Sequence, residues 1–154
     1  MPPIDTGLHG THVLTDEQEI MNVIKSFQAN TKNFWGACVD STLPAFSVGK
    51  VRQGYVEASR RGVMIFYLTE ITTENLPHCK EIMRFAKLRH LNGVRGNFAV
   101  SDTEYLVGVV RGDTLGSLVH SDVKELVQQQ RNVFDMLWEH ALPAKDRIQQ
   151  LRDS

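Results

Sequence analysis

Apolar residues recur along this chain in two patterns, short uninterrupted runs and longer stretches with helical spacing. The runs Phe34–Val39 and Val63–Leu68 contain almost no polar residue, which is typical of strands buried on both faces of a parallel sheet. Helical spacing predicts helices before, between and after these runs, at about residues 15–32, 48–61 and 73–88. Because helices and buried strands alternate, this part of the chain predicts right-handed parallel crossovers.

Local signals at helix ends support these elements. Thr15 and Gln18 have the spacing of a capping box, which predicts that the first helix begins at Thr15. Pro77 is compatible with the first turn of the third helix. Arg61 and Gly62 end the second helix, since a cation suits the last turn and glycine suits the position beyond it.

The pattern changes after Leu88. Residues 89–96 are rich in glycine and basic residues and predict a loop. Short strands are expected at residues 97–101, 105–110 and 117–120, and the polar turn between the first two predicts a hairpin.

A long amphipathic helix is expected to begin at Ser121 and to reach about residue 141. We expect residues 1–13 to form a flexible leader, residues 14–142 an α/β domain, and residues 143–154 the start of a connector helix. The predicted fold class is therefore α/β, with a mixed, mostly parallel sheet flanked by helices and a long C-terminal helix.

Composition adds limits on the class of protein. The chain has 154 residues, 42% hydrophobic and 23% charged, which argues against a disordered chain. No apolar run approaches the roughly 20 residues that a membrane-spanning helix needs, and no secretion signal is recognisable. Two cysteines are too few for a disulfide framework. We therefore expect a cytoplasmic protein with no membrane partner.

The overall charge is nearly balanced. The formal net charge is −1, and the pI is near 6.6. Domains that bind the phosphate backbone usually carry an excess of cations. On this ground we expect no direct nucleic-acid partner.

Polar residues follow the two buried strands. Ligands of parallel sheets collect beyond the carboxyl ends of the strands, which indicates Asp40 and Ser41 after the first run and Glu70 and Thr72 after the second. The two carboxylates could hold a metal, act as acid and base, or orient an arginine. Alternatively, each caps a helix or pairs with a nearby basic group.

The most concentrated cationic cluster lies in the predicted loop. Arg89, His90 and Arg95 stand close in the sequence, and Gly93 and Gly96 allow a ligand to approach the backbone. This combination suits an anion or a carboxylate ligand. The alternative is a solvated turn.

The spacing of cysteines, histidines and nucleophilic residues does not indicate a metal site or a covalent catalytic mechanism. The cysteines and histidines match no structural zinc pattern, so Cys38 and Cys79 are expected to be small buried hydrophobic residues. We find no nucleophile elbow, P-loop or dinucleotide fingerprint. We therefore assign no catalytic residue, metal or cofactor.

One segment carries a family resemblance. Residues 95–102, followed by residues 105–108, resemble the second half of a phospholipase-D-like repeat, whose motif is His-x-Lys-x-x-x-x-Asp on a hairpin. Arg95 then stands where that family has its nucleophilic histidine, and Asn97 where it has its lysine, whereas Asp102 is retained. The resemblance implies a phospholipase-D-like half that can bind an anion. A guanidinium cannot replace the nucleophilic imidazole.

A second resemblance extends over most of the chain. Residues 68–76, 88–91, 96–102, 123–130 and 134–144 are similar to the N-terminal input domain of archaeal sensor histidine kinases and related regulators. This resemblance implies a dimeric sensory module that precedes a PAS domain or a kinase core. Its ligand is an unknown small molecule.

Together these observations favour a non-catalytic sensory or regulatory domain that dimerises and binds a small, anionic ligand. Two alternatives are a metal-dependent or acid–base hydrolase of the phospholipase-D-like superfamily, and a protein-interaction module or effector domain of a transcription regulator. The interaction module would use an apolar face around Phe134. The expected ligand-binding residues are Asp40, Glu70, Arg89, His90, Arg95, Asn97 and Asp102.

Overall fold

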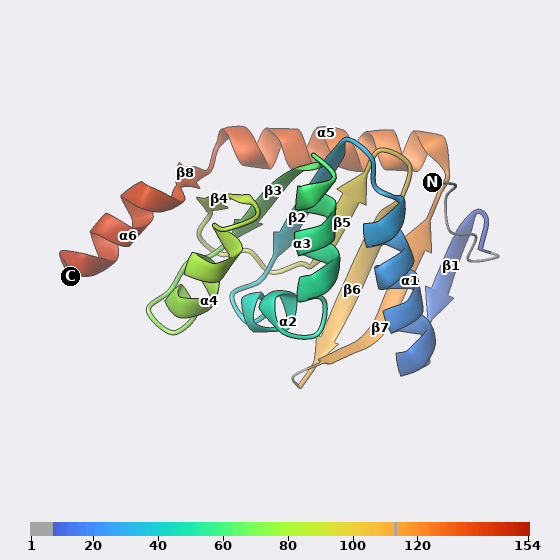
Figure 1. The fold of residues 1–154 in the computed structure, drawn as a ribbon, viewed down its shortest axis with the longest axis horizontal. Helices are drawn as coiled ribbons and strands as arrows, with labels where there is room; N and C mark the ends of the chain where they lie inside the picture. The colour runs from blue at the N-terminus through green and yellow to red at the C-terminus, as the bar shows by residue number, and fades with distance from the viewer. Residues whose placement is uncertain (1–7, 113) are drawn as a thin grey trace.

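A single sheet of eight strands forms the centre of the molecule (Figure 1). The computed structural model describes residues 8–112 and 114–154. The strands do not lie in the order of the sequence. Across the sheet their order is β1-β7-β6-β5-β2-β3-β4-β8. The strands are β1 (Thr11–Leu14), β2 (Phe34–Val39), β3 (Met64–Thr69), β4 (Lys87–His90), β5 (Phe98–Ser101), β6 (Tyr105–Arg111), β7 (Thr114–Ser121) and β8 (Leu142–Pro143).

The sheet is mixed, as expected, and its parallel strands lie toward the β8 edge. Strands β2, β3 and β4 run parallel to one another, whereas every other pairing is antiparallel. The parallel part arises from the crossovers that the alternating pattern predicts. Two antiparallel pairings, β5–β6 and β6–β7, join consecutive strands, and the expected hairpin between β5 and β6 is confirmed. The other three join strands that are distant in the sequence.

Helices cover both faces of the sheet. Helices α1, α2, α3 and α4 lie over one face, and α5 runs across the other (Figure 1). None of the helices in the described ranges is long and apolar enough to cross a membrane. The helices are α1 (Glu17–Asn30), α2 (Pro44–Val48), α3 (Arg52–Arg60), α4 (Leu76–Ile82), α5 (Lys124–Glu139) and α6 (Ala144–Arg152).

The central strand β2 shows why an uninterrupted apolar run is needed here. Successive side chains of a strand point to opposite faces. Trp35 and Val39 belong to the core beneath α1–α4, whereas Phe34 and Cys38 belong to the core beneath α5. Since all six residues of β2 are buried, a polar residue at any of them would lack solvent.

Several local expectations need correction. Residues 11–13, which we placed in a flexible leader, belong to β1 and pair with β7, while the rest of the leader up to residue 7 lies outside the described residues. The N-cap of α1 is Asp16, whose side chain accepts the Glu19 amide, so the cap lies one residue after Thr15. Helix α2 and strand β4 were not predicted.

Candidate functional site

The carboxyl ends of the parallel strands meet at one edge of the sheet, here called the carboxyl edge. Asp40 directly follows β2, Glu70 directly follows β3, and His90 is the last residue of β4. Asn97 precedes β5, which runs antiparallel to β2, and therefore lies at the same edge. Arg95 lies in the connection between β4 and β5, at the same edge. The topology thus brings five of the seven expected site residues to one edge.

Asp40 and Asn97 form a reciprocal pair. The Asn97 amide donates to Asp40 Oδ2 at 2.9 Å, and the backbone N–H of Asp40 donates to Asn97 Oδ1 at 2.9 Å. The other carboxylate oxygen of Asp40 accepts both the backbone N–H and the hydroxyl of Thr42. Burial alone raises the pKa of Asp40, but these hydrogen bonds outweigh it and hold the pKa below its usual value. Asp40 is therefore a charged structural acceptor with its polar partners in place.

Glu70 and His90 hold the chain segments that leave β3 and β4. Glu70 Oε1 accepts the backbone N–H of Gly93 at 2.9 Å. His90 Nδ1 accepts the backbone N–H of Ile71 at 2.9 Å, which assigns the proton to Nε2, and Nε2 donates to Asn92 Oδ1 at 2.8 Å. Both ring nitrogens of His90 are occupied, so the imidazole is not available as a free base.

This arrangement makes the stability of the fold sensitive to mild acid. Burial lowers the pKa of His90, with a further contribution from Arg147. Because the pKa of the folded state is lower than that of the unfolded state, the unfolded chain binds more protons once the pH falls below the ordinary histidine value. We expect the free energy of unfolding to decrease from about pH 7 to about pH 5. Urea denaturation at a series of pH values measures it.

The matched variant is His90→Asn. It removes the titrating ring, and its pH dependence over this interval should be flatter than that of the wild type. Equal slopes for the two proteins would assign the acid sensitivity to other groups.

Arg89 lies on the other side of the sheet from this network. Its guanidinium stacks on the Trp138 ring at 4.5 Å and donates to the backbone carbonyl of Trp138 at 2.8 Å. It thus holds the C-terminal end of α5, where a cation also suits the helix dipole. This residue is a structural link rather than part of the edge cluster.

Arg95 is the one expected site residue that remains free to bind. It lies in the connection between β4 and β5, and its side chain is exposed. No hydrogen bond or ion pair to its side chain occurs within the part of the chain that the structure describes.

Asp102 lies at the opposite end of β5 from Asn97. Its carboxylate accepts three backbone N–H groups, those of Lys32, Asn33 and Phe34, at 2.9 to 3.1 Å. These amides belong to the segment that enters β2, so Asp102 aligns the start of β2 with the end of β5. The retained residue of the motif has this structural contact and is separated from the carboxyl edge by the length of β2.

We expect Asp102→Ala to lower the free energy of unfolding by about 1–2 kcal/mol, because the variant loses the three amide hydrogen bonds that the carboxylate accepts. The loss is moderate because Asp102 is exposed, so water can replace the carboxylate. Chemical denaturation measures this change. Asp102→Asn keeps one acceptor oxygen and should lose less. Equal losses for the two variants would mean that the amide contacts do not stabilise the fold.

Few groups at the carboxyl edge are available to bind a metal ion or to act as a nucleophile. Within the described ranges, no group of three or more histidine, cysteine or acidic side chains is placed to hold a metal ion. Cys38 and Cys79 are buried in different cores, and burial raises the pKa of each thiol to about 12. The polar residues of the carboxyl edge hold the loops in place, and the exposed guanidinium of Arg95 can attract an anion.

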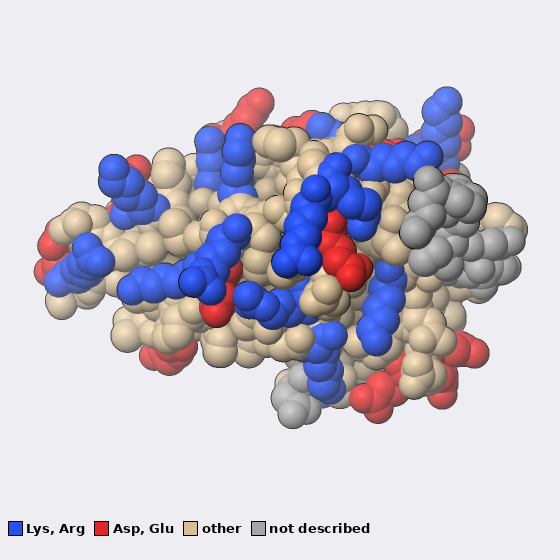
Figure 2. Space-filling view, in the orientation of Figure 1, with Lys and Arg blue, Asp and Glu red and all other residues tan. Residues whose placement is uncertain are grey.

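Charge is strongly segregated along the chain and over the surface. Residues 25–95 contain eleven Lys and Arg against five Asp and Glu, a net charge of +6, whereas the remaining residues carry six against thirteen, a net charge of −7. Figure 2 shows Lys and Arg side chains gathered over α1, α3 and α4. We call this surface the basic face; its exposed cations are Lys25, Lys32, Lys50, Arg60, Arg61, Lys80 and Arg84.

One acid of the basic face, Glu81, is paired with two arginines. Glu81 accepts from Arg52 at 3.0 Å and lies 3.6 Å from Arg84. Its hydrogen bond to Arg52 and the charges of both arginines lower the pKa of Glu81.

A surface hollow of about 300 Å³ lies between α1 and α3 within the basic face. Lys25, Lys50 and Arg61 line it together with Glu57, so three cations border one concavity. The Arg61 guanidinium also donates to the carbonyls of Gln28 and Thr31 and thereby ties α3 to the end of α1.

Three solved structures share this fold at low sequence identity. Nuc from Salmonella typhimurium, described as a phospholipase D family member, has a TM-score of 0.70 and 12% identity over 86% of this chain and 97% of its own. NucT from Helicobacter pylori has a TM-score of 0.71 and 14% identity over 86% of this chain and 96% of its own. TrmBL2, described as an archaeal chromatin protein with a novel mode of DNA binding, has a TM-score of 0.69 and 17% identity. The match covers 88% of this chain and 54% of TrmBL2. No protein family or curated protein matches.

These structures confirm the phospholipase-D-like fold that residues 95–108 indicated. They give no support to the resemblance to sensor histidine kinases. They also overturn the expectation that nucleic acid is excluded as a direct partner, because TrmBL2, which shares the fold, is described as binding DNA. The physical reason is that a net charge of −1 averages over a basic and an acidic part of the chain.

Proposed function

We propose that this chain binds nucleic acid through the phosphate backbone with its basic face, and does not cleave it. The observation that carries this proposal is the segregation of charge, because seven exposed cations gather on and beside three helices of one face. Long Lys and Arg side chains neutralise phosphates and release condensed counterions, which supplies most of the affinity in non-specific binding. The description of TrmBL2 as a DNA-binding chromatin protein agrees with this proposal.

The proposed absence of cleavage rests on the motif positions. An imidazole nucleophile would be needed at position 95 for a phosphoenzyme route, and this chain has arginine there. Asn97 replaces the lysine and is hydrogen bonded to Asp40. Arg95 is exposed, and in this proposal it adds a further phosphate contact at the carboxyl edge.

The other interpretations have less support from the geometry. A small anionic ligand at the carboxyl edge finds few free donors, because Asp40, Glu70 and His90 are already hydrogen bonded to Asn97, Asn92 and backbone amides. An interaction module on the long C-terminal helix would need Phe134 exposed, whereas its side chain is buried against the sheet.

Fluorescence anisotropy of a labelled DNA duplex, recorded at a series of salt concentrations, tests the proposal. We expect binding at low salt and a linear fall of the logarithm of the binding constant with the logarithm of salt concentration. Each neutralised phosphate should contribute roughly 0.9 to the slope. No binding at low salt, or an affinity independent of salt, would overturn the proposal.

A second experiment tests the absence of cleavage. The same duplex is incubated with the protein, with and without divalent cations, and should remain intact on a gel. Cleavage of the duplex would favour the hydrolase.

A further inference from the structure

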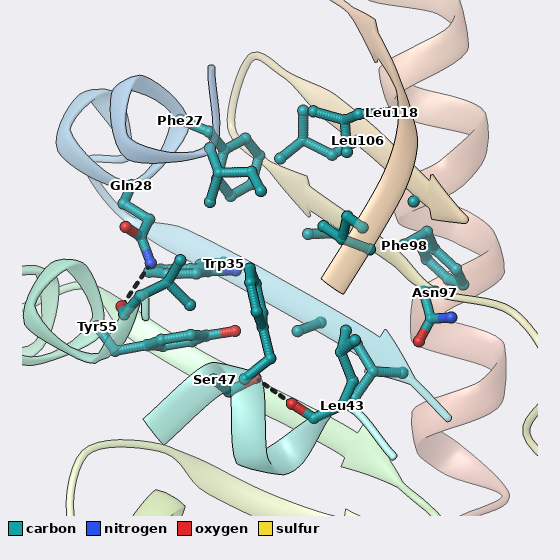
Figure 3. Close-up of a pocket in the computed structure, with 18 residues that line it drawn as sticks. Phe27, Gln28, Trp35, Leu43, Ser47, Tyr55, Asn97, Phe98, Leu106 and Leu118 are labelled. Atoms are coloured by element: carbon teal, nitrogen blue, oxygen red, sulfur yellow. Dashed lines mark hydrogen bonds between the residues drawn. The ribbon is translucent and has the colours of Figure 1, made fainter. Parts of the chain in front are cut away.

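A small apolar cavity lies on the side of the sheet that α1–α4 cover. It has a volume of about 70 Å³ and is bordered by α1, α2 and α3 and by strands β2, β5, β6 and β7 (Figure 3). Its lining is almost entirely carbon, contributed by residues such as Phe27, Leu106 and Leu118. None of the described residues that line it carries a charge.

One polar atom in this lining lacks a partner. The indole nitrogen of Trp35 is buried and makes no hydrogen bond within the described part of the chain. The side chain is 2% exposed, and Figure 3 shows its nitrogen directed toward the middle of the lining residues. An unsatisfied buried N–H is costly and rare in folded proteins, so its presence calls for an explanation.

The Trp35 ring is held so that its N–H cannot turn elsewhere. The indole stacks on Tyr55 with ring centroids 4.0 Å apart and an angle of 15° between the planes. Phe27 contacts it edge to face, with centroids 5.6 Å apart. The donor is therefore fixed in direction by packing, as in a preorganised binding site.

Other polar groups of the lining are already bonded to the protein. The Ser47 hydroxyl lies 2.7 Å from the Tyr67 hydroxyl, and the Gln28 amide donates to the carbonyl of Val51 at 3.0 Å. A buried water typically makes about three hydrogen bonds. In this apolar cavity it would find the Trp35 donor and few further partners, so a weakly held water is easily displaced.

We propose that this cavity binds a small, neutral, mostly apolar molecule with one hydrogen-bond acceptor, such as a carbonyl or ether oxygen that accepts the N–H of Trp35. Charge is excluded because no charged side chain lines the cavity. An apolar protein cavity of about 150 Å³ accommodates benzene, so 70 Å³ selects a smaller molecule. Leu43 and Phe46, which form the wall at α2, are half-buried.

Acetone is a suitable probe because it is smaller than benzene, and isobutene is its counterpart of the same shape without an acceptor oxygen. In ¹⁵N-correlated NMR spectra the chain gives two indole N–H signals, because it has two tryptophans. We expect acetone to shift the Trp35 signal in a saturable manner and to leave the Trp138 signal in place. Isobutene should bind about fivefold more weakly, the factor that a neutral hydrogen bond typically supplies. The absence of a saturable shift, or equal affinity for the two probes, would overturn the proposal.

Two variants complete the test. Trp35→Phe removes the donor and should lower the affinity for acetone by about fivefold. Nearby methyl signals follow this change. Ala99→Val fills part of the cavity and should abolish binding, since Ala99 belongs to the lining. A folded Ala99→Val protein that still binds the probe would place the ligand elsewhere and overturn the proposal, even if Trp35→Phe fails to fold.

Discussion

Changing Lys25, Lys50 and Arg60 together to glutamate is expected to weaken duplex DNA binding at least about tenfold, a change of about 1.4 kcal/mol. All three side chains are exposed, and none has a hydrogen bond or ion pair within the described residues, so the fold should persist. Lys25 and Lys50 border the same hollow between α1 and α3. Loss of three phosphate contacts should also reduce the salt slope by roughly 3. Anisotropy at matched salt measures both effects.

The matched control changes Lys124, Lys145 and Arg152 to glutamate. These exposed residues lie on α5 and α6 and do not belong to the cations that define the basic face, and the control alters the net charge by the same amount. It should leave the affinity and the salt slope close to those of the wild type. If both triple variants weaken binding equally, DNA binding depends on net charge alone and the basic face is not the contact surface.

The parts of the fold that the sequence predicted have strong local patterns. The run Phe34–Val39 has no polar residue, and β2 occupies those six positions. By contrast, β1 has only four residues with alternating character, and its partner β7 lies more than a hundred residues away. Strand β4 contains Lys87, which the sequence pattern placed in a helix, and Arg89, which it placed in a loop, yet the rings that both contact lie on one face of the sheet. These two strands therefore form because of their pairing with distant strands, which local propensity does not reveal.

The candidate site was predictable in part. The rule that ligands collect at the carboxyl ends of parallel strands placed Asp40 and Glu70 at the same edge, as found. The sequence did not reveal that these carboxylates would be satisfied by Asn97 and by the amide of Gly93. The basic face was missed for a different reason, because the total charge was considered instead of its distribution. The excess of cations in residues 25–95 was the available signal.

Phe134→Ala is expected to lower the free energy of unfolding by about 3–5 kcal/mol, a large part of the stability of a typical domain. The side chain is 1% exposed and packs beneath α5 against the rings of Phe34 and Phe98. It also lies directly on the backbone of Gly36, where a Cβ atom would come within 2.9 Å of the ring. Removing the ring therefore opens a cavity between α5 and β2 that the close-packed sheet cannot fill.

Met136→Ala on the same helix is the control for this prediction. Met136 is 59% exposed, so its truncation should change the stability by no more than about 0.5 kcal/mol. Phe134→Leu, which keeps most of the buried volume, should fall between the two. Urea denaturation and thermal unfolding follow the series, with a loss of roughly 10 °C expected for Phe134→Ala. Phe134 belongs to the core between α5 and the sheet. Equal stability of the Phe134→Ala and Met136→Ala proteins would therefore contradict the packing of α5 on the sheet.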